Sequence, residues 1–363
     1  MTAPSAATGA SGPVLVTGGA GFIGANIADR LAQEGRQVLV YDALRRPGVE
    51  ENLTWLQRRH AGRIAAMRAD IRDASALAEA LRGAEAVFHL AAQVAVTTSL
   101  ADPAEDFGVN LQGTFLLLDL MRRRSGGPCP LVFASTNKVY GDLADVPLGK
   151  ANGAWVPRDA ALRETGVAES QPLDFHTPYG CSKGAADQYV LDFARSYGLP
   201  ATVLRMSCIY GPRQMGTEDQ GWVAHFLIRA LREEPVTIYG DGCQVRDILH
   251  VDDAVAAWIG AWRCIGATAG HAFNLGGGPA NAVSLLQVLH AIGDITGKRV
   301  EVAHGPVRAG DQRWFVADAR RARTTLGLPE PRPWRAGLRH LATWLQDERG
   351  LRARRSLAVE ALR

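Results

Sequence analysis

A tyrosine and a lysine lie four residues apart, Tyr179 and Lys183, where a helix is predicted to begin. This spacing places both side chains on one face of a helix. Because a free tyrosine titrates near pH 10, a phenolate base near pH 7 needs its pKa lowered by about three units, equivalent to about 4 kcal/mol. A neighbouring ammonium group and a cationic cofactor ring can together supply this stabilisation. The pair therefore favours a lysine-activated tyrosine base over two surface side chains on an ordinary helix.

A glycine-rich segment near the N-terminus predicts a second kind of site. It reads TGGAGFIG from Thr17, follows a predicted strand and opens a predicted helix. Glycines let the backbone turn sharply and approach a pyrophosphate, whose charge then lies at the helix N-terminus. The residues expected to bind a dinucleotide here are Gly18, Gly21, Phe22, Ile23 and Gly24.

Asp42 indicates which dinucleotide this segment binds. It follows directly on the second predicted strand, where a carboxylate accepts hydrogen bonds from the ribose hydroxyls and repels a 2′-phosphate. NAD is therefore favoured over NADP. Arg45 and Arg46 could hold such a phosphate, although a solvated loop is the simpler explanation for them. The residues after the third and fourth strands are expected to line the same sheet edge: Asp70, Ile71, Leu90, Ala91 and Ala92.

The composition argues against nucleic-acid and membrane partners. The 363 residues include 40 Lys+Arg and 37 Asp+Glu, and a net charge of +3 spread over this length is no basic patch. Only four of the basic residues are lysines: Lys138, Lys150, Lys183 and Lys298. Arginine cannot replace a compact ammonium group whose pKa is tunable, so each lysine is a candidate for a specific role.

The cysteines and the termini indicate a cytoplasmic protein. The five cysteines form no CxxC pair and are expected to be reduced thiols, and no metal site is expected. No apolar run approaches the roughly 18 residues of a membrane span. Residues 1–12 lack the basic start and apolar centre of a signal peptide, so they are interpreted as a flexible leader.

The elements that must position these residues alternate along the first half of the chain. Apolar runs at 13–17, 37–41, 63–68, 86–89 and 131–134 are separated by stretches of helical periodicity such as 26–33 and 74–81. This alternation predicts an α/β fold with a Rossmann-type, doubly wound parallel sheet, joined by a further strand at 201–205.

A smaller C-terminal α/β lobe is expected to follow the sheet domain. Beyond residue 207 glycine and proline recur, and the helices are short, near 222–232, 283–296 and 336–346. The expected organisation is a leader at 1–12, an NAD-binding Rossmann domain at 13–206, a lobe at 207–349 that mainly binds substrate and returns some segments to the sheet domain, and a tail at 350–363.

Two long helical stretches carry apolar stripes. The stretch 105–124 has Phe107, Leu111, Phe115 and Leu118 on one face, and the stretch 179–197 has Tyr189, Phe193 and Tyr197. Each stripe is explained either by burial in the core or by a dimer interface, and core packing is the default.

The motifs together resemble the extended short-chain dehydrogenase/reductase superfamily of nucleotide-sugar enzymes. The resemblance covers roughly residues 13–345. Within that family the chain is most similar to the CDP-paratose 2-epimerases. The segments that carry this closer similarity are STNKVYGDL from Ser135, LDFHTPYGCSKGAADQY from Leu173, DQGWV from Asp219, QVRDILH from Gln244 and PVRAGDQRWFVAD from Pro306.

The resemblance implies an enzyme with tightly held NAD and assigns roles to individual residues. Tyr179 is then the base, Lys183 positions the nicotinamide ribose and lowers the tyrosine pKa, and Thr136 hydrogen-bonds the reacting hydroxyl. Oxidation of a sugar carbon by NAD⁺ gives a transient keto sugar, which turns before hydride returns to its opposite face. The resemblance also implies a homodimer formed through the stretches 105–124 and 179–197.

A sugar that turns must be anchored elsewhere, by its nucleotide diphosphate. Arg246 and Arg308 are the candidate anchors because guanidinium groups suit bidentate phosphate contacts, although ion pairs with Asp247 or Asp311 are the alternative. Asn137 is a candidate substrate contact. With Lys138 it occupies two positions where related 4,6-dehydratases carry Asp and Glu, which favours epimerisation over water elimination. Lys138 itself is either a substrate contact or a surface ion pair.

Two segments depart from the 2-epimerase pattern. Cys208, a further candidate substrate contact, stands where those enzymes carry Ser, and PVTIYGDG at 235–242 resembles UDP-sugar C4-epimerases. The sequence therefore predicts C2 epimerisation of a CDP-(dideoxy)hexose, with a UDP-sugar C4-epimerase as the alternative. A non-catalytic, NAD-sensing regulatory protein is the alternative from another class.

Overall fold

The computed structural model describes residues 12–308 and 310–351. The expected leader lies outside this part of the chain except for residue 12, and the expected tail lies outside it from residue 352 onward.

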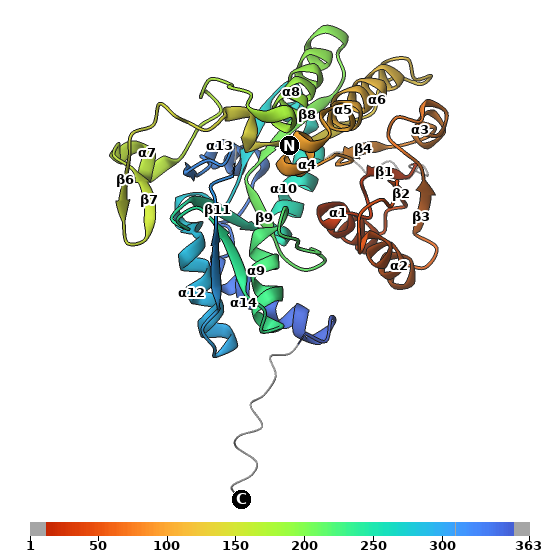
Figure 1. The fold of residues 1–363 in the computed structure, drawn as a ribbon. Helices are drawn as coiled ribbons and strands as arrows, with labels where there is room; N and C mark the ends of the chain where they lie inside the picture. Colours follow the sequence, from red (N-terminus) through yellow and green to blue (C-terminus); the bar gives the residue numbers. More distant parts are fainter. Residues whose placement is uncertain (1–11, 309, 352–363) are drawn as a thin grey trace, which may run out of the picture.

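The short apolar runs of the sequence form one seven-stranded sheet in which every neighbouring pair is parallel (Figure 1). The strand order is β12-β8-β5-β4-β1-β2-β3. Because this order reverses between β1 and β4, a crevice is expected at the carboxyl ends of the central strands. The strands are β1 (Val14–Thr17), β2 (Val38–Asp42), β3 (Ile64–Arg68), β4 (Ala86–His89), β5 (Leu131–Thr136), β8 (Ala201–Met206) and β12 (Ala272–Leu275).

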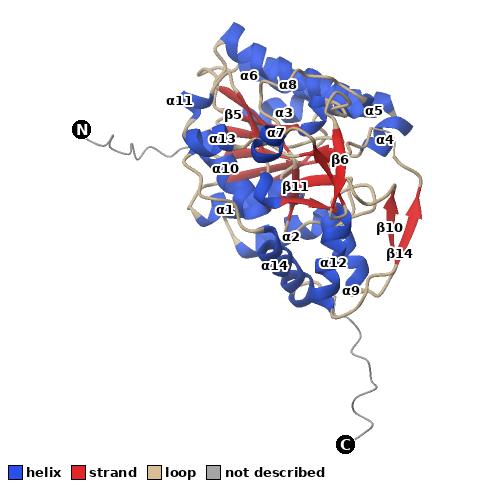
Figure 2. Ribbon diagram, turned by 90° about the vertical axis from the view of Figure 1, so that its left-hand side faces the viewer, coloured by secondary structure: helices blue, strands red, loops and turns tan. Residues whose placement is uncertain are grey.

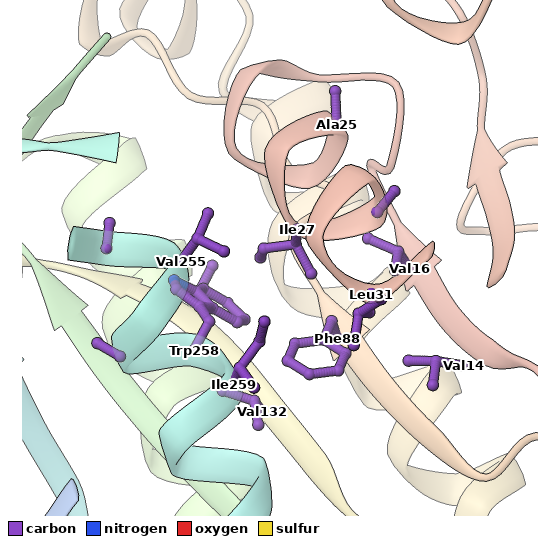
Figure 3. Packing of buried hydrophobic residues seen from close by; sticks show 14 of the residues in the cluster. Val14, Val16, Ala25, Ile27, Leu31, Phe88, Val132, Val255, Trp258 and Ile259 are labelled. Atoms are coloured by element: carbon purple, nitrogen blue, oxygen red, sulfur yellow. The ribbon is translucent and has the colours of Figure 1, made fainter. Parts of the chain in front are cut away.

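Helices cover both faces of the sheet, because successive strand residues point to opposite sides. Val14 and Val16 of β1 belong to one apolar cluster, with α1 and α10, whereas Leu15 belongs to the other, with α6 and α8. Figure 3 shows the first cluster, where Phe88 of β4 lies near Trp258 of α10, 6.0 Å between ring centroids. The helices on the first face are α1 (Phe22–Gln33), α2 (Val49–Arg59), α10 (Val251–Arg263) and α13 (Arg320–Leu326).

A second group of helices covers the opposite face, and the last of them carries Tyr179 and Lys183. They are α3 (Ala74–Leu81), α6 (Gly113–Arg122) and α8 (Thr177–Tyr197). The predicted helix at 105–124 is α5 (Pro103–Phe107), a π-helical turn η1 (Gly108–Gln112) and α6 in succession. The short elements nearby are α4 (Val96–Ala101), η2 (Asn137–Tyr140), α7 (Ala160–Thr165) and α11 (Ile265–Thr268).

A smaller lobe packs against the carboxyl edge of this sheet. Its central strand β11 (Val245–His250) pairs with β9, β13 and β15, and β10 pairs with β14 in a separate two-stranded ladder (Figure 2). The remaining elements are β6 (Leu148–Ala151), β7 (Ala154–Pro157), β9 (Cys208–Tyr210), α9 (Trp222–Leu231), β10 (Val236–Tyr239), η3 (Pro279–Asn281), β13 (Ala282–Ser284), α12 (Leu285–Thr296), β14 (Val302–Gly305), β15 (Trp314–Phe315) and α14 (Trp334–Asp347).

The predicted fold class is confirmed, and the strand expected at 201–205 joins the sheet as β8. The sheet also contains β12, a strand that was not predicted from the sequence and that lies far beyond residue 206. The division of the chain into 13–206 and 207–349 stays a prediction. Among the described residues, no helix is both long and apolar enough to cross a membrane.

Candidate active site

The glycine-rich segment turns between β1 and α1 with almost no room for side chains. Gly18 has a φ of +66°, and a Cβ there would lie 2.7 Å from the amide nitrogen of Ala91. A Cβ on Gly24 would lie 2.3 Å from the carbonyl oxygen of Gly18. No side chain caps α1 and no acidic residue lies in its first turn, so no side chain of the helix neutralises its first amide groups and its dipole. This cradle fits the pyrophosphate of a dinucleotide.

Asp42 lies at the end of β2, against the glycine-rich turn. Its carboxylate accepts hydrogen bonds from the backbone amides of Ala20, at 3.0 Å, and Leu44, at 2.9 Å. Burial raises the pKa of Asp42, and the backbone hydrogen bonds oppose that shift. Since a carboxylate has about four acceptor positions, it retains capacity for ribose hydroxyls.

Asp70 is engaged by arginines. Arg72 binds both of its oxygens, at 2.8 Å each, and Arg45 lies 3.1 Å away. The hydrogen bond with Arg72 lowers the pKa of Asp70 to about 2. Arg45, a conceivable partner for a 2′-phosphate, also pairs with Glu105 at 2.7 Å. These ion pairs explain Arg45 without a bound 2′-phosphate.

The remaining predicted cofactor residues lie along the same edge. Ile71 is buried and limits the approach of α6, since a Cβ on Gly113 would lie 2.7 Å from its Cγ2. Leu90 and Ala91 follow β4 directly and contact the turn at Gly18. The predicted site residues of β1, β2, β3 and β4 therefore lie at one end of the sheet, as expected for parallel strands.

Thr136 and Tyr179 meet where β5 ends and α8 begins. Pro178 occupies the first turn of α8, where its missing amide hydrogen costs no helical hydrogen bond. Burial raises the pKa of the Tyr179 phenol to about 12, against the opposing effect of its hydrogen bond with Thr136. The backbone amide of Tyr179 donates to the Ser99 hydroxyl at 3.2 Å, which fixes the start of the helix.

Lys183 lies one turn along α8 and is buried. Its Nζ lies 4.3 Å from the centre of the Phe133 ring on β5. Burial lowers the pKa of Lys183 to about 7, and the carboxylates of Asp187 and Asp106 oppose this shift. The structure thus brings the three predicted catalytic residues, Thr136, Tyr179 and Lys183, to the meeting point of β5 and α8.

Two buried polar clusters behind these residues were not predicted. In one, Asp106 of α5 accepts hydrogen bonds from Ser182 at 2.5 Å, Gln93 at 2.9 Å and Asn110 at 3.1 Å. Asn110 reaches this cluster from the π-helical turn η1. Ser182 could have been recognised from the sequence, because it lies within the Tyr179–Lys183 segment. Its partners come from distant segments, and no local pattern connects them.

In the second cluster, Asp187 and Arg205 form a buried bidentate ion pair. Both of their hydrogen bonds measure 2.9 Å, and Ser135 donates to Asp187 at 2.7 Å. Tyr140 extends the network by accepting a hydrogen bond from Arg205 at 3.0 Å. This network begins next to Thr136 and one turn from Lys183, and so ties β5, α8 and β8 together.

Asn137 and Lys138 extend from the end of β5 toward a loop of the smaller lobe. Asn137 donates to the side-chain oxygen of Gln312 at 3.0 Å, and Lys138 donates to the carbonyl of Gly310 at 2.9 Å. Burial and the nearby charge of Arg246 lower the pKa of Lys138 to about 8. Within the described part of the chain, Lys138 therefore binds a backbone carbonyl of the smaller lobe and forms no ion pair.

The candidate diphosphate anchors have carboxylate partners. Arg246 is buried on β11 and forms an ion pair with Asp311, at 2.6 Å. Asp311 was one of the two carboxylates that the sequence offered as its ion-pair partner. Arg308 stacks on Tyr239 at 3.8 Å and donates to the Glu218 carbonyl at 3.1 Å. Its nearest carboxylate is that of Asp219, at 3.5 Å, and not one of the two expected partners. The positive charge of Arg246 contributes to the lowered pKa of Lys138, and the Arg308 side chain is directed toward Tyr239 and Glu218.

Cys208 begins β9 close to Lys138 and Arg246. It accepts a hydrogen bond from the Trp222 indole at 3.4 Å, and burial raises the pKa of its thiol despite the nearby positive charges. The thiol is therefore held neutral. The structure thus gathers the predicted substrate residues Asn137, Cys208 and Arg246 with Lys138 around one region. Arg308 adjoins this region through its carbonyl, which accepts a hydrogen bond from the amide of Asp311 at 3.3 Å.

Comparisons with known proteins agree with this geometry. Residues 14–276 match the model of the NAD dependent epimerase/dehydratase family. The chain is 38% identical to CDP-paratose 2-epimerase of Salmonella typhi over 91% of this chain and 98% of that enzyme. It is also similar to UDP-glucose 4-epimerase of Thermotoga maritima, solved with UDP-glucose, with 32% identity, a TM-score of 0.78 and coverage of 93% and 99% of the two chains. UDP-glucose 4-epimerase of Thermus thermophilus, solved with NAD, is 31% identical, with a TM-score of 0.76 and coverage of 92% and 99%.

Proposed function

Because this chain belongs to the NAD dependent epimerase/dehydratase family, we propose that it is a nucleotide-sugar epimerase that inverts C2 of a CDP-activated (dideoxy)hexose. The main support is that Thr136, Tyr179 and Lys183 lie together where β5 ends and α8 begins. Asn137 and Lys138 lie beside them. Neither of the last two is a carboxylate. Elimination of water needs an acid and a base on the sugar, and neither position carries the carboxylate that related 4,6-dehydratases have there.

In this proposal Tyr179 accepts the proton of the reacting hydroxyl while Thr136 orients that hydroxyl. NAD, when bound, supplies the hydride acceptor and a positive charge beside the phenol. Lys183 adds a second positive charge, held by the carboxylates of Asp187 and Asp106. Both charges favour the phenolate, which the chain alone disfavours.

Inversion requires the keto sugar to present its opposite face while the nucleotide stays bound. Arg246 and Arg308 are our candidates for the diphosphate anchors. Each already has a carboxylate or carbonyl partner, so binding would exchange or share those contacts. Asp311 binds the Arg246 guanidinium and its amide donates to the Arg308 carbonyl, so both candidates border the same loop.

A UDP-sugar C4-epimerase is the second candidate. It is supported by the similarity to two UDP-glucose 4-epimerases over more than 90% of the chain. The same tyrosine, threonine and lysine would serve either reaction, and the difference lies in how the sugar is placed.

Parallel incubation with CDP-paratose and UDP-glucose, followed by proton NMR of the products, tests the proposal. We expect the C2 epimer of CDP-paratose to form. Turnover of UDP-glucose alone would instead support the C4 reaction. Protein that holds no NAD and turns over neither sugar would favour the regulatory alternative, which the presence of both Tyr179 and Lys183 argues against.

A further inference from the structure

The segment 211–215, which follows β9, packs directly against the cofactor cradle. The Pro212 carbonyl accepts a hydrogen bond from Asn26 of α1 at 3.1 Å. The side-chain amide of Asn52 donates both to the Arg213 carbonyl and to the carbonyl of Ala20 in the glycine-rich turn, at 3.2 Å each. One buried amide therefore connects the turn to this segment. Figure 1 shows the chain after β9 approaching α1 and α2.

The Arg213 side chain links this segment to two helices from opposite ends of the chain. Its guanidinium lies 3.8 Å from the ring centre of Trp55 on α2 and 5.4 Å from that of Trp344 on α14. It also forms an ion pair with Glu348, just beyond α14. The side chain is 12% exposed. The site thus joins the sheet domain, the segment and the smaller lobe through one arginine.

The backbone of Arg213 adopts an unusual conformation that the surrounding contacts must stabilise. Its φ is +71°, in the left-handed region that residues other than glycine rarely adopt. Such a conformation persists only where the surrounding contacts determine it, and these positions cluster at ligand clamps and active sites. Met215 adds a close contact, since a Cβ on Gly48 would lie 2.6 Å from its Cγ.

An epimerase that oxidises and then reduces the same sugar must keep its dinucleotide between the two steps. We propose that Arg213 is a positioning residue that clamps the segment 211–215 between Trp55 and Trp344 and so retains NAD(H) in the crevice. This inference rests on the proposed function. It assigns dinucleotide retention to residues that do not touch the reacting atoms.

The rate of NAD release tests this role. Wild-type and Arg213→Ala proteins are loaded with NAD, passed rapidly through a desalting column, and followed by chromatographic assay of protein-bound NAD over time. We expect release from Arg213→Ala to be faster by roughly tenfold, which corresponds to about 1.4 kcal/mol of lost stabilisation. Arg213→Lys keeps the charge without the planar stack, and we expect an intermediate rate.

Arg59→Ala is the matched control. Arg59 stacks on the same Trp55 ring, at 5.7 Å, and pairs with Asp29 of α1, so its own contacts are with α1 and α2 and not with the segment. We expect wild-type release from this variant. Equal release from wild type and a folded Arg213→Ala protein would overturn the proposal, as would equally fast release from Arg59→Ala.

Arg213→Lys also guards against a folding defect. If Arg213→Ala does not fold, wild-type release from Arg213→Lys overturns the inference, and faster release supports it. Wild-type protein that binds no NAD at all would instead overturn the proposed function, so the two failures are distinguishable.

Discussion

At the scale of single residues, the pKa values of Tyr179 and Lys183 are displaced in opposite directions, away from each other. Burial raises the pKa of the Tyr179 phenol to about 12 and lowers that of Lys183 to about 7. Burial favours the neutral form of each group, so the chain alone holds the phenol in its inactive, protonated form. Substrate and cofactor charges must complete the site.

We expect Tyr179→Phe to lower turnover by about 10²–10⁴-fold, the usual contribution of a general base. The ring is retained and only the hydroxyl is lost, so bound NAD should be unchanged. Turnover by NMR and NAD content by absorbance, measured on the same preparation, check both statements. Wild-type turnover in the variant would remove Tyr179 from the base role.

NAD loading should also move the titration of this phenol. A positive charge beside the phenol stabilises the phenolate, so its pKa should fall below the value of about 12 found for the chain alone. The difference in 295 nm absorbance between wild type and Tyr179→Phe isolates this tyrosine. Its phenolate signal should appear at lower pH with NAD than without, and identical titrations would contradict the electrostatic argument.

At the scale of elements, Asp187 joins α8 to β5 and β8. Its carboxylate accepts from Arg205 and Ser135, and all three side chains are buried. Asp187→Leu leaves the buried Arg205 charge without its carboxylate, with only Tyr140 as a neutral partner. This should lower the free energy of unfolding by about 3–5 kcal/mol. Urea unfolding measures this loss. The double variant Asp187→Leu/Arg205→Met should recover most of it, and no recovery would contradict the uncompensated-charge explanation.

Asp247 of β11 joins the smaller lobe to the sheet. It accepts from Ser207, after β8, at 2.5 Å and from the amide of Gly278, after β12, at 3.1 Å. Burial raises its pKa to about 6. Because this carboxyl binds a proton more tightly in the folded state than in the unfolded state, its contribution to stability is full below about pH 4 and is lost as pH rises through 6.

Comparison with Asp247→Asn isolates that contribution. The free energy of unfolding of wild type minus that of the variant should fall by about 3 kcal/mol between pH 4 and pH 7, the equivalent of the pKa shift. Other titrating groups, such as buried His89, are common to both proteins and cancel. Urea unfolding at a series of pH values gives the difference, and a difference independent of pH would contradict the raised pKa.

These elements show how far the sequence could predict the fold and the site. Tyr179 and Lys183 share one helix, and the glycine-rich turn lies between a strand and a helix, so local spacing identifies both. The contacts of Asp106 depend on a π-helical turn and on packing against α8, which no local periodicity encodes. Similarly, Gln312 meets Asn137 only because the lobe folds back onto β5.

At the scale of the whole molecule, one aromatic surface remains uncovered. Phe107 is 53% exposed, Tyr197 54%, and Phe115 and Tyr189 43% each. These residues lie on α5, α6 and α8, on the helical layer that also carries Tyr179. Phe115 and Tyr189 contact each other edge to face, with ring centroids 5.6 Å apart. Core packing therefore does not account for the whole of either apolar stripe.

Adjacent exposed aromatic residues on one face mark an interaction surface, and a second copy of the chain is the partner expected from the sequence. We expect sedimentation velocity to give a homodimer. Phe115→Glu/Tyr189→Glu should give a monomer, because dimerisation would bury the new carboxylates without partners. Leu286→Glu, on α12 of the smaller lobe and 37% exposed, should leave the dimer intact. A monomeric wild type, or a dimer that survives the double substitution, would show that this aromatic face serves no self-association.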